Sequence, residues 1–179
     1  MAQAGGDTEK VNIINAGNMD FFNMQAQGVD FSWIYYGWTG VEAELRGQDI
    51  DMLYLTDYAK ELNYYTPIIV TNERYIEENE ETVRKFMAAV TKGYQYAIDA
   101  PKEAAKVLSD AVPELDSELV EASAIWLAER YQADAPRWGE QSLDVWTDFA
   151  EWMAAHNLIT EPFEAEKAFT NEFLPEGAK

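Results

Sequence analysis

Residues 29–45, VDFSWIYYGWTGVEAEL, constrain the fold of this chain more than any other stretch. Residues 29–36 are rich in β-branched and aromatic side chains, which predicts a buried strand. Gly37 then turns the chain into a short predicted helix that ends at Gly47. A strand, a tight turn and a helix N-terminus in this order are typical of an open α/β sheet, where ligands bind beyond the carboxyl ends of the strands.

Trp38 and Glu42 are the first candidate ligand-binding residues. They are four residues apart, so on a helix they share one face near its N-terminus. An aromatic surface beside a carboxylate suits a flat, nitrogen-rich, partly cationic ligand, which can stack on the indole and donate to the acid. The alternative is that Trp38 is a core residue and Glu42 is a solvated acid of the first helical turn.

The segments around this stretch complete a predicted parallel βαβαβ lobe. Residues 11–16 and 50–56 are expected to be strands, and a helix is expected between the turn at residues 18–20 and Gly28. Asn18 or Asp20 is the expected N-cap of that helix, and the alternative is that both face the ligand crevice. Residues 1–4 look like the last turn of a helix that ends at Gly5.

The chain changes character after the third predicted strand. Residues 57–65 are expected to cross between two lobes, and residues 67–70 to form a short strand. Tyr64 and Tyr65 either line a cleft at this crossing or pack there. We therefore expect most of one lobe in residues 1–62 and a return into the other, incomplete lobe in residues 63–179.

The second part is predicted to be mainly helical. Asn79 and Asp116 are expected N-caps, and Pro101 precedes a predicted helix over residues 102–111. Further helices are expected around residues 146–153 and over residues 165–173. One four-residue strand is too little sheet to cover the apolar faces of these helices. Another segment of a parent protein, repacking of the helices or a second copy in a homodimer would have to cover them.

Composition excludes several functions. The 179 residues carry a formal net charge of −20, which argues against nucleic acid as a partner. The chain has no cysteine, and its single histidine, His156, is expected at a helix C-terminus. No catalytic triad, phosphate-binding glycine loop, metal cluster, signal peptide or transmembrane run is apparent. We therefore predict no enzymatic activity and no cofactor.

Six motifs carry a resemblance to a known family. They are GNMDFF, DFSWIYYGWTGVEAELRG, YYTPIIVTNE, VRKFMAAVTKGYQYAIDAPKEAAKVL, RWGEQ and AFTNEFLP. Together they resemble the substrate-binding proteins of ABC importers that carry pyrimidine precursors of thiamine. This group is the hydroxymethylpyrimidine synthase-like branch of the type 2 periplasmic binding fold. The likeness runs over nearly the whole chain and implies an N-terminally truncated, two-lobe α/β protein.

The resemblance also implies a function and its residues. It implies capture of an aminopyrimidine or similar heteroaromatic nutrient outside the cytoplasmic membrane and delivery to a permease, with membrane contact only through that permease or a lipid anchor. The implied ligand-binding residues are Tyr36, Trp38, Glu42, Asn18 and Asp20, and Tyr65 at the crossing between the lobes is a further candidate. Because a cleft encloses its ligand from two sides, we expect this chain alone to bind weakly or not at all.

Two alternatives come from other classes of protein. A ligand-sensing or interaction domain could use the same fold. The fungal pyrimidine synthases also share this fold. The resemblance implies that these relatives are enzymes with a cysteine-rich motif and an active-site histidine that uses iron. An enzyme of that kind is disfavoured because this chain has no cysteine.

Overall fold

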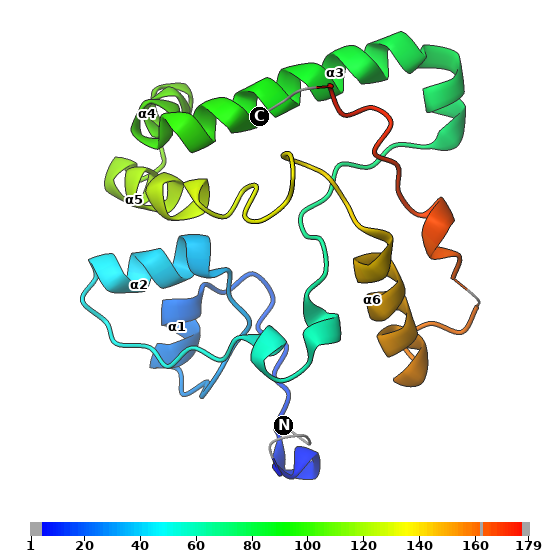
Figure 1. The fold of residues 1–179 in the computed structure, drawn as a ribbon. Helices are drawn as coiled ribbons and strands as arrows, with labels where there is room; N and C mark the ends of the chain where they lie inside the picture. The colour runs from blue at the N-terminus through cyan, green and yellow to red at the C-terminus, as the bar shows by residue number, and fades with distance from the viewer. Residues whose placement is uncertain (1–4, 162, 177–179) are drawn as a thin grey trace. The chain divides into compact units, whose positions relative to one another are not determined.

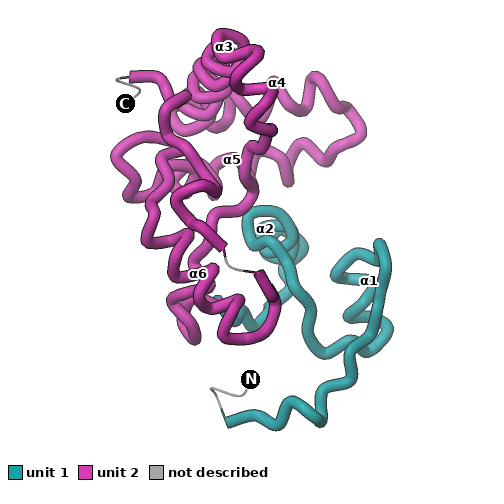
Figure 2. Tube along the Cα trace, turned by 90° about the vertical axis from the view of Figure 1, so that its right-hand side faces the viewer, with its two compact units in different colours: residues 1–54 teal, residues 55–179 magenta. Residues whose placement is uncertain are grey.

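The computed structural model describes residues 5–161 and 163–176 (Figure 1). The helix end expected over residues 1–4 lies outside the described residues. The chain divides into two compact units, residues 1–54 and residues 55–179 (Figure 2). Whether these units correspond to the two expected lobes, with a boundary near residue 62, stays a prediction.

The first unit is held by short helices. They are a 3₁₀ turn at Thr8–Lys10, α1 at Phe21–Ala26, a π-helical turn at Tyr36–Gly40 and α2 at Val41–Leu45. Asp20 is the N-cap of α1, because its Oδ1 accepts the backbone N–H of Asn23 at 3.1 Å. This confirms one of the two predicted caps. Helix α2 ends just before Gly47, whose φ of 66° is the left-handed conformation expected after a helix C-terminus.

The predicted strands do not form in the part of the chain that the structure describes. Residues 11–16, 50–56 and 67–70 contain no strand, and in residues 29–36 the last residue instead begins the π-helical turn. Ile13 is 90% exposed and Val70 is 76% exposed. A strand needs a neighbour for its backbone N–H and C=O groups, and no described segment supplies one. The prediction of a parallel βαβαβ lobe is therefore wrong for these residues.

Residues 31–35 nevertheless keep the side-chain alternation of a strand. Phe31, Trp33 and Tyr35 are exposed, whereas Ser32 and Ile34 between them are half-buried. Successive side chains of extended backbone point to opposite sides, so this pattern survives without a pairing partner. The prediction of a buried strand over residues 29–36 is therefore wrong, because these three aromatic side chains are exposed and no pairing forms with any described segment.

The second unit consists of four main helices and several turns. The helices are α3 at Glu73–Asp99, α4 at Pro101–Ala111, α5 at Ser117–Ala128 and α6 at Leu143–Ala155. Short 3₁₀ turns lie at Leu55–Asp57, Lys60–Leu62 and Ala165–Lys167. The helix predicted over residues 165–173 is therefore wrong, because only this single 3₁₀ turn forms there.

The caps explain where the helices begin. Asp116 accepts the backbone N–H of Glu118 at 2.9 Å, which confirms its predicted role as the N-cap of α5. Pro101 occupies the first turn of α4, where its missing N–H leaves no broken hydrogen bond. Helix α3 begins earlier than predicted, after Asn72, and Asn79 instead has non-helical φ and ψ of −139° and 33° at a kink. At the end of α6, His156 is the C-cap, as predicted.

The core of the second unit combines packed helices with an aromatic group. Leu119 and Val120 of α5 are buried, and α5 packs along α4 (Figure 1). The ring of Tyr94 on α3 stacks on Trp138 with centroids 4.3 Å apart and meets Tyr131 edge-on at 5.0 Å. These contacts join α3 to the loop that follows α5.

Apolar side chains of the helices are only partly covered. Phe86, Val107 and Ile125, on α3, α4 and α5, are all exposed. On α6, Trp146 stacks on Phe169 with centroids 5.9 Å apart, and Phe149 stacks on Tyr64 at 4.4 Å. The aromatic side chains of α6 therefore pack against rings of neighbouring segments, while other apolar positions of the helices are exposed to solvent.

The C-terminal segment is fastened by an asparagine. Asn171 Oδ1 accepts the backbone N–H of Gln141 at 3.0 Å, and Asn171 Nδ2 donates to the Gln141 carbonyl at 2.8 Å. Arg84 of α3 donates to the Glu172 carbonyl at 2.7 Å, and the side chain of Leu174 is buried. The Asn171 hydrogen bonds join the two motifs RWGEQ and AFTNEFLP, which are separated in sequence, and Arg84 joins the second motif to α3.

Candidate ligand-binding site

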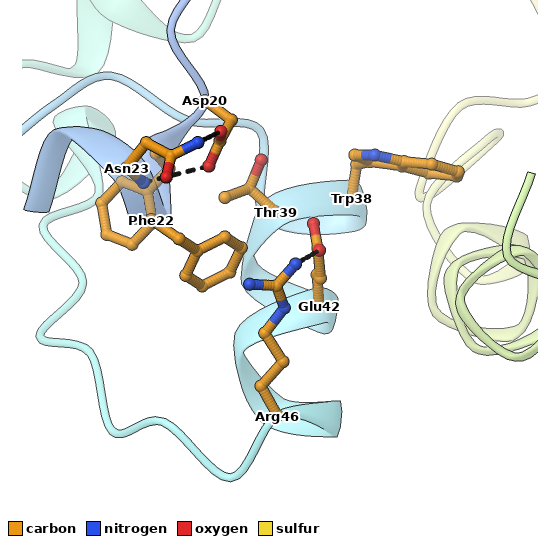
Figure 3. A pocket seen from close by; sticks show the side chains of 8 residues that line it. Asp20, Phe22, Asn23, Trp38, Thr39, Glu42 and Arg46 are labelled. Atoms are coloured by element: carbon orange, nitrogen blue, oxygen red, sulfur yellow. Dashed lines mark hydrogen bonds and ion pairs between the residues drawn. The ribbon is translucent and has the colours of Figure 1, made fainter. Parts of the chain in front are cut away.

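A pocket of about 290 Å³ lies in the first unit, between the start of α1 and the turn that leads into α2 (Figure 3). Its lining residues are Asp20, Phe21, Phe22, Asn23, Trp38, Thr39, Glu42 and Arg46. All of them belong to one unit, so the pocket depends on no contact with the rest of the chain.

Asp20 and Asn23 form the α1 wall of the pocket. Asp20 Oδ1 accepts the Asn23 backbone N–H, and Oδ2 accepts from the Asn23 side-chain amide. The backbone hydrogen bond from Asn23 is the main influence that lowers the pKa of Asp20 below its ordinary value. Asp20 is therefore an ionised cap, and both of its oxygens already accept a hydrogen bond.

Glu42 and Arg46 form the α2 wall. Arg46 Nη2 donates to Glu42 Oε1, and the two residues are one helical turn apart. The guanidinium also lies over the ring of Phe22, with Cζ 3.9 Å from the ring centroid. The Glu42 side chain is 24% exposed, which makes it the more enclosed member of the ion pair.

Trp38 borders the pocket on the α2 side. Its side chain is 38% exposed, and the indole extends away from Asp20 and Asn23 (Figure 3). The indole is thus neither buried in the core nor closed over the α1 wall. A ligand that stacked on it would lie on the Trp38 side of Glu42.

The other predicted site residues lie elsewhere. The Tyr36 hydroxyl donates to Glu44 of α2, and the ring packs on Gly40. Asn18 is exposed in the turn before α1 and does not line the pocket. Tyr65 belongs to the second unit, where its hydroxyl accepts the backbone N–H of Ser142 at 2.8 Å, just before α6. The structure therefore brings together Asp20, Trp38 and Glu42 from the predicted set.

The sequence did not predict the lining residues Phe21, Phe22, Asn23, Thr39 and Arg46. Two of these residues had a usable signal, because Asn23 follows the Asp20 cap by three positions and Arg46 follows Glu42 by four. Phe22 had none, since its contact with Arg46 joins two different helices.

The pocket offers side chains that can form hydrogen bonds with a polar ligand. Glu42 and Asp20 supply acceptors, Arg46 supplies donors, and Thr39 supplies a hydroxyl that can do either. In residues 5–161 and 163–176, no group of three or more His, Asp or Glu side chains could hold a metal ion. No helix within these ranges combines the length and apolar character needed to cross a bilayer. A small concave site with a few convergent polar groups is typical of small-molecule binding.

The chain belongs to the NMT1/THI5-like family, which matches residues 1–104. It is 29% identical over 175 residues to a formylaminopyrimidine-binding protein of Halalkalibacterium halodurans, across 94% of this chain and 52% of that protein. It is 30% identical over 145 residues to the riboflavin-binding protein RibY of Chloroflexus aurantiacus, across 75% of this chain and 40% of that one. The chain thus spans about half the length of these relatives or less, and the family resemblance drawn from its motifs is confirmed.

Proposed function

We propose that this chain serves as a solute-binding component of an ABC importer and that its ligand is an aminopyrimidine precursor of thiamine or a similar small heteroaromatic nutrient. The observation that carries this proposal is the Glu42 carboxylate at the pocket, beside the accessible indole of Trp38. A carboxylate accepts hydrogen bonds from an exocyclic amino group, and an indole stacks on a flat ring.

The size of the pocket favours a single-ring ligand. Sites for drug-sized ligands usually enclose about 300–1,000 Å³. The pocket here, at about 290 Å³, lies just below that range. One relative is named for formylaminopyrimidine and the other for riboflavin, whose three-ring system is larger. The volume therefore supports the pyrimidine over the flavin as ligand.

The proposal includes capture outside the cytoplasmic membrane and delivery to a permease, without chemistry. Two relatives named as binding proteins support the transport role, and the absence of cysteine from the sequence argues against the synthase alternative. His156 lies in the second unit, where its ring stacks on Trp152 with centroids 4.1 Å apart. A sensing or interaction domain of the same fold is the second candidate, and it would bind the same ligand class.

Titration of the full chain with 4-aminopyrimidine and with riboflavin, followed by NMR of the backbone and indole N–H groups, tests the proposal. We expect weak binding of 4-aminopyrimidine, with chemical-shift changes confined to the pocket residues, including the indole N–H of Trp38. Trp38→Leu and Glu42→Gln should each weaken it, whereas Trp126→Leu, in the second unit, should not. Preference for riboflavin would contradict the proposed ligand. A dissociation constant below about 1 µM would contradict the expectation that this chain alone binds weakly.

A further inference from the structure

We propose that Arg46 is a positioning residue that fixes Glu42 for recognition of an exocyclic amino group on the ligand. This inference rests on the proposed function, because it assigns to Arg46 the amino-group specificity of the same pocket. Arg46 is the only basic residue among the described lining residues.

Arg46 is held from two sides. Its guanidinium donates to Glu42 on its own helix, and its Cζ atom lies 3.9 Å from the ring centroid of Phe22 on α1. The side chain therefore links the two helices that form the pocket walls (Figure 3). A planar guanidinium can stack and donate at the same time, whereas the ammonium of a lysine is a compact charge without a stacking face.

This arrangement differs from an ordinary surface ion pair. Exposed pairs four residues apart on a helix contribute little, because water competes for both charges. Arg74 and Glu78 on α3 are such a pair, since their closest atoms are 3.9 Å apart and both side chains are largely exposed. Glu42 is much less exposed than Glu78, and Arg46 has an aromatic ring to hold it in place.

The ion pair leaves one oxygen of Glu42 for the ligand. Oε1 accepts from Arg46, and Oε2 accepts no hydrogen bond from any described residue. Both oxygens of Asp20 are already engaged by Asn23. Glu42 Oε2 is thus the carboxylate oxygen of this pocket that has no partner among the described residues, which makes it the most readily available acceptor for a ligand amino group. Arg46 fixes where that oxygen points.

A specificity effect follows from this geometry. Without Arg46 the Glu42 side chain gains rotamer freedom and must be ordered again by each ligand, so its hydrogen bond to an amino group loses strength. A ligand without the amino group makes no such bond and should bind equally well with or without Arg46. Loss of Arg46 should therefore reduce discrimination between the two ligands more than it reduces affinity in general.

The test compares 4-aminopyrimidine with unsubstituted pyrimidine, titrated by NMR into the full chain and into Arg46→Met, Arg46→Lys and Arg74→Met. We expect the unaltered chain to prefer 4-aminopyrimidine about tenfold, as a hydrogen bond to a charged group allows. Arg46→Met should reduce this preference to about twofold or less, and Arg46→Lys should retain only part of it. Affinity for unsubstituted pyrimidine should stay within about twofold, and Arg74→Met should change neither value.

Two results would overturn the inference. A preference that survives in Arg46→Met would show that Glu42 needs no positioning, and equal weakening of both ligands would show a purely structural role for Arg46. If the unaltered chain had no preference for 4-aminopyrimidine, the proposed function would itself fail. A preference that is present but independent of Arg46 would contradict only the role of Arg46.

Discussion

The aromatic ring of Tyr36 lies directly against the α-carbon of Gly40. A Cβ atom at position 40 would be 2.6 Å from Tyr36 Cγ and 2.7 Å from Cδ2, which is closer than side chains pack. The π-helical turn that carries Trp38 therefore requires glycine at its last position. Tyr36 acts in this unit as a support for the turn, and its hydroxyl reaches Glu44 on α2.

Gly40→Ala should destabilise the first unit by about 1–3 kcal/mol, as overpacking of a well-packed site does. The new methyl group must displace the Tyr36 ring, which would also move Trp38. Urea unfolding monitored by tryptophan fluorescence measures the change. Gly93→Ala is the matched control, since that position on α3 has open space around it, and it should stabilise its helix by about 0.5–1 kcal/mol. Equal effects at the two positions would contradict the packing argument.

Thr91→Val should raise the free energy of unfolding by about 1 kcal/mol. Thr91 on α3 is buried, and its hydroxyl has no hydrogen-bond partner in the part of the chain that the structure describes. Valine has nearly the same shape and removes the unsatisfied polar atom. Thr91→Ser keeps the hydroxyl and loses the methyl group, so chemical denaturation should show this variant to be less stable than the unaltered chain.

Asp20 should contribute to stability in a pH-dependent manner. Its folded-state pKa lies below the ordinary value of 3.8, so this contribution is present above that value and is lost as the pH falls through the folded pKa. NMR titration of the side-chain carboxyl carbon should show the lowered pKa directly. Asp20→Asn keeps an N-cap acceptor without the charge, and unfolding experiments between about pH 5 and pH 2 should show that this component has disappeared. A carboxyl pKa at or above that of a free aspartate would contradict the cap geometry.

Asn171→Ala should loosen the C-terminal segment and reduce stability by about 1–3 kcal/mol, because both hydrogen bonds to the Gln141 backbone are lost. Limited proteolysis should then cut within residues 169–176 more readily. Glu172→Ala is a suitable control, because Arg84 contacts only the carbonyl of that residue and its side chain is exposed. Similar proteolysis of the two variants would show that Asn171 does not fasten the segment.

A phosphate group on the ligand should weaken binding. The pocket holds the carboxylates of Asp20 and Glu42 against the single guanidinium of Arg46, so an added anion meets net repulsion. We expect an aminopyrimidine phosphate ester to bind about fivefold more weakly than the corresponding alcohol at low ionic strength, with the difference shrinking as salt is added. NMR titrations at two salt concentrations measure both values. Tighter binding of the phosphate ester would contradict the proposed ligand class.

Local features of the fold were predictable from sequence. Asp20, Asp116 and Pro101 mark helix starts because a cap or a first-turn proline acts within a few residues of itself. The strands were not predictable in the same way, because a strand exists only with a neighbour and side-chain pattern says nothing about whether one is present. Residues 31–35 show this, because their exposure alternates as in a strand although no strand pairing forms.

The residues of the candidate site also differ in whether the sequence gives a local signal for them. Trp38 and Glu42 were found because one helical turn separates them, and that spacing is visible in the sequence. The contact between Arg46 and Phe22 joins two helices and has no local signature. Tyr65 was expected either to line a cleft or to pack at the crossing between lobes, and its hydroxyl accepts a backbone N–H just before α6. A role of Tyr65 in ligand binding stays a prediction.

The lining of the pocket is drawn from residues 20 to 46 alone, a short and continuous part of the chain. Such a site needs little loop closure to assemble, so it should form early in folding and survive transplantation between related chains. Recombination that exchanged this one segment could alter which nutrient is recognised while leaving the long helices of the second unit unchanged.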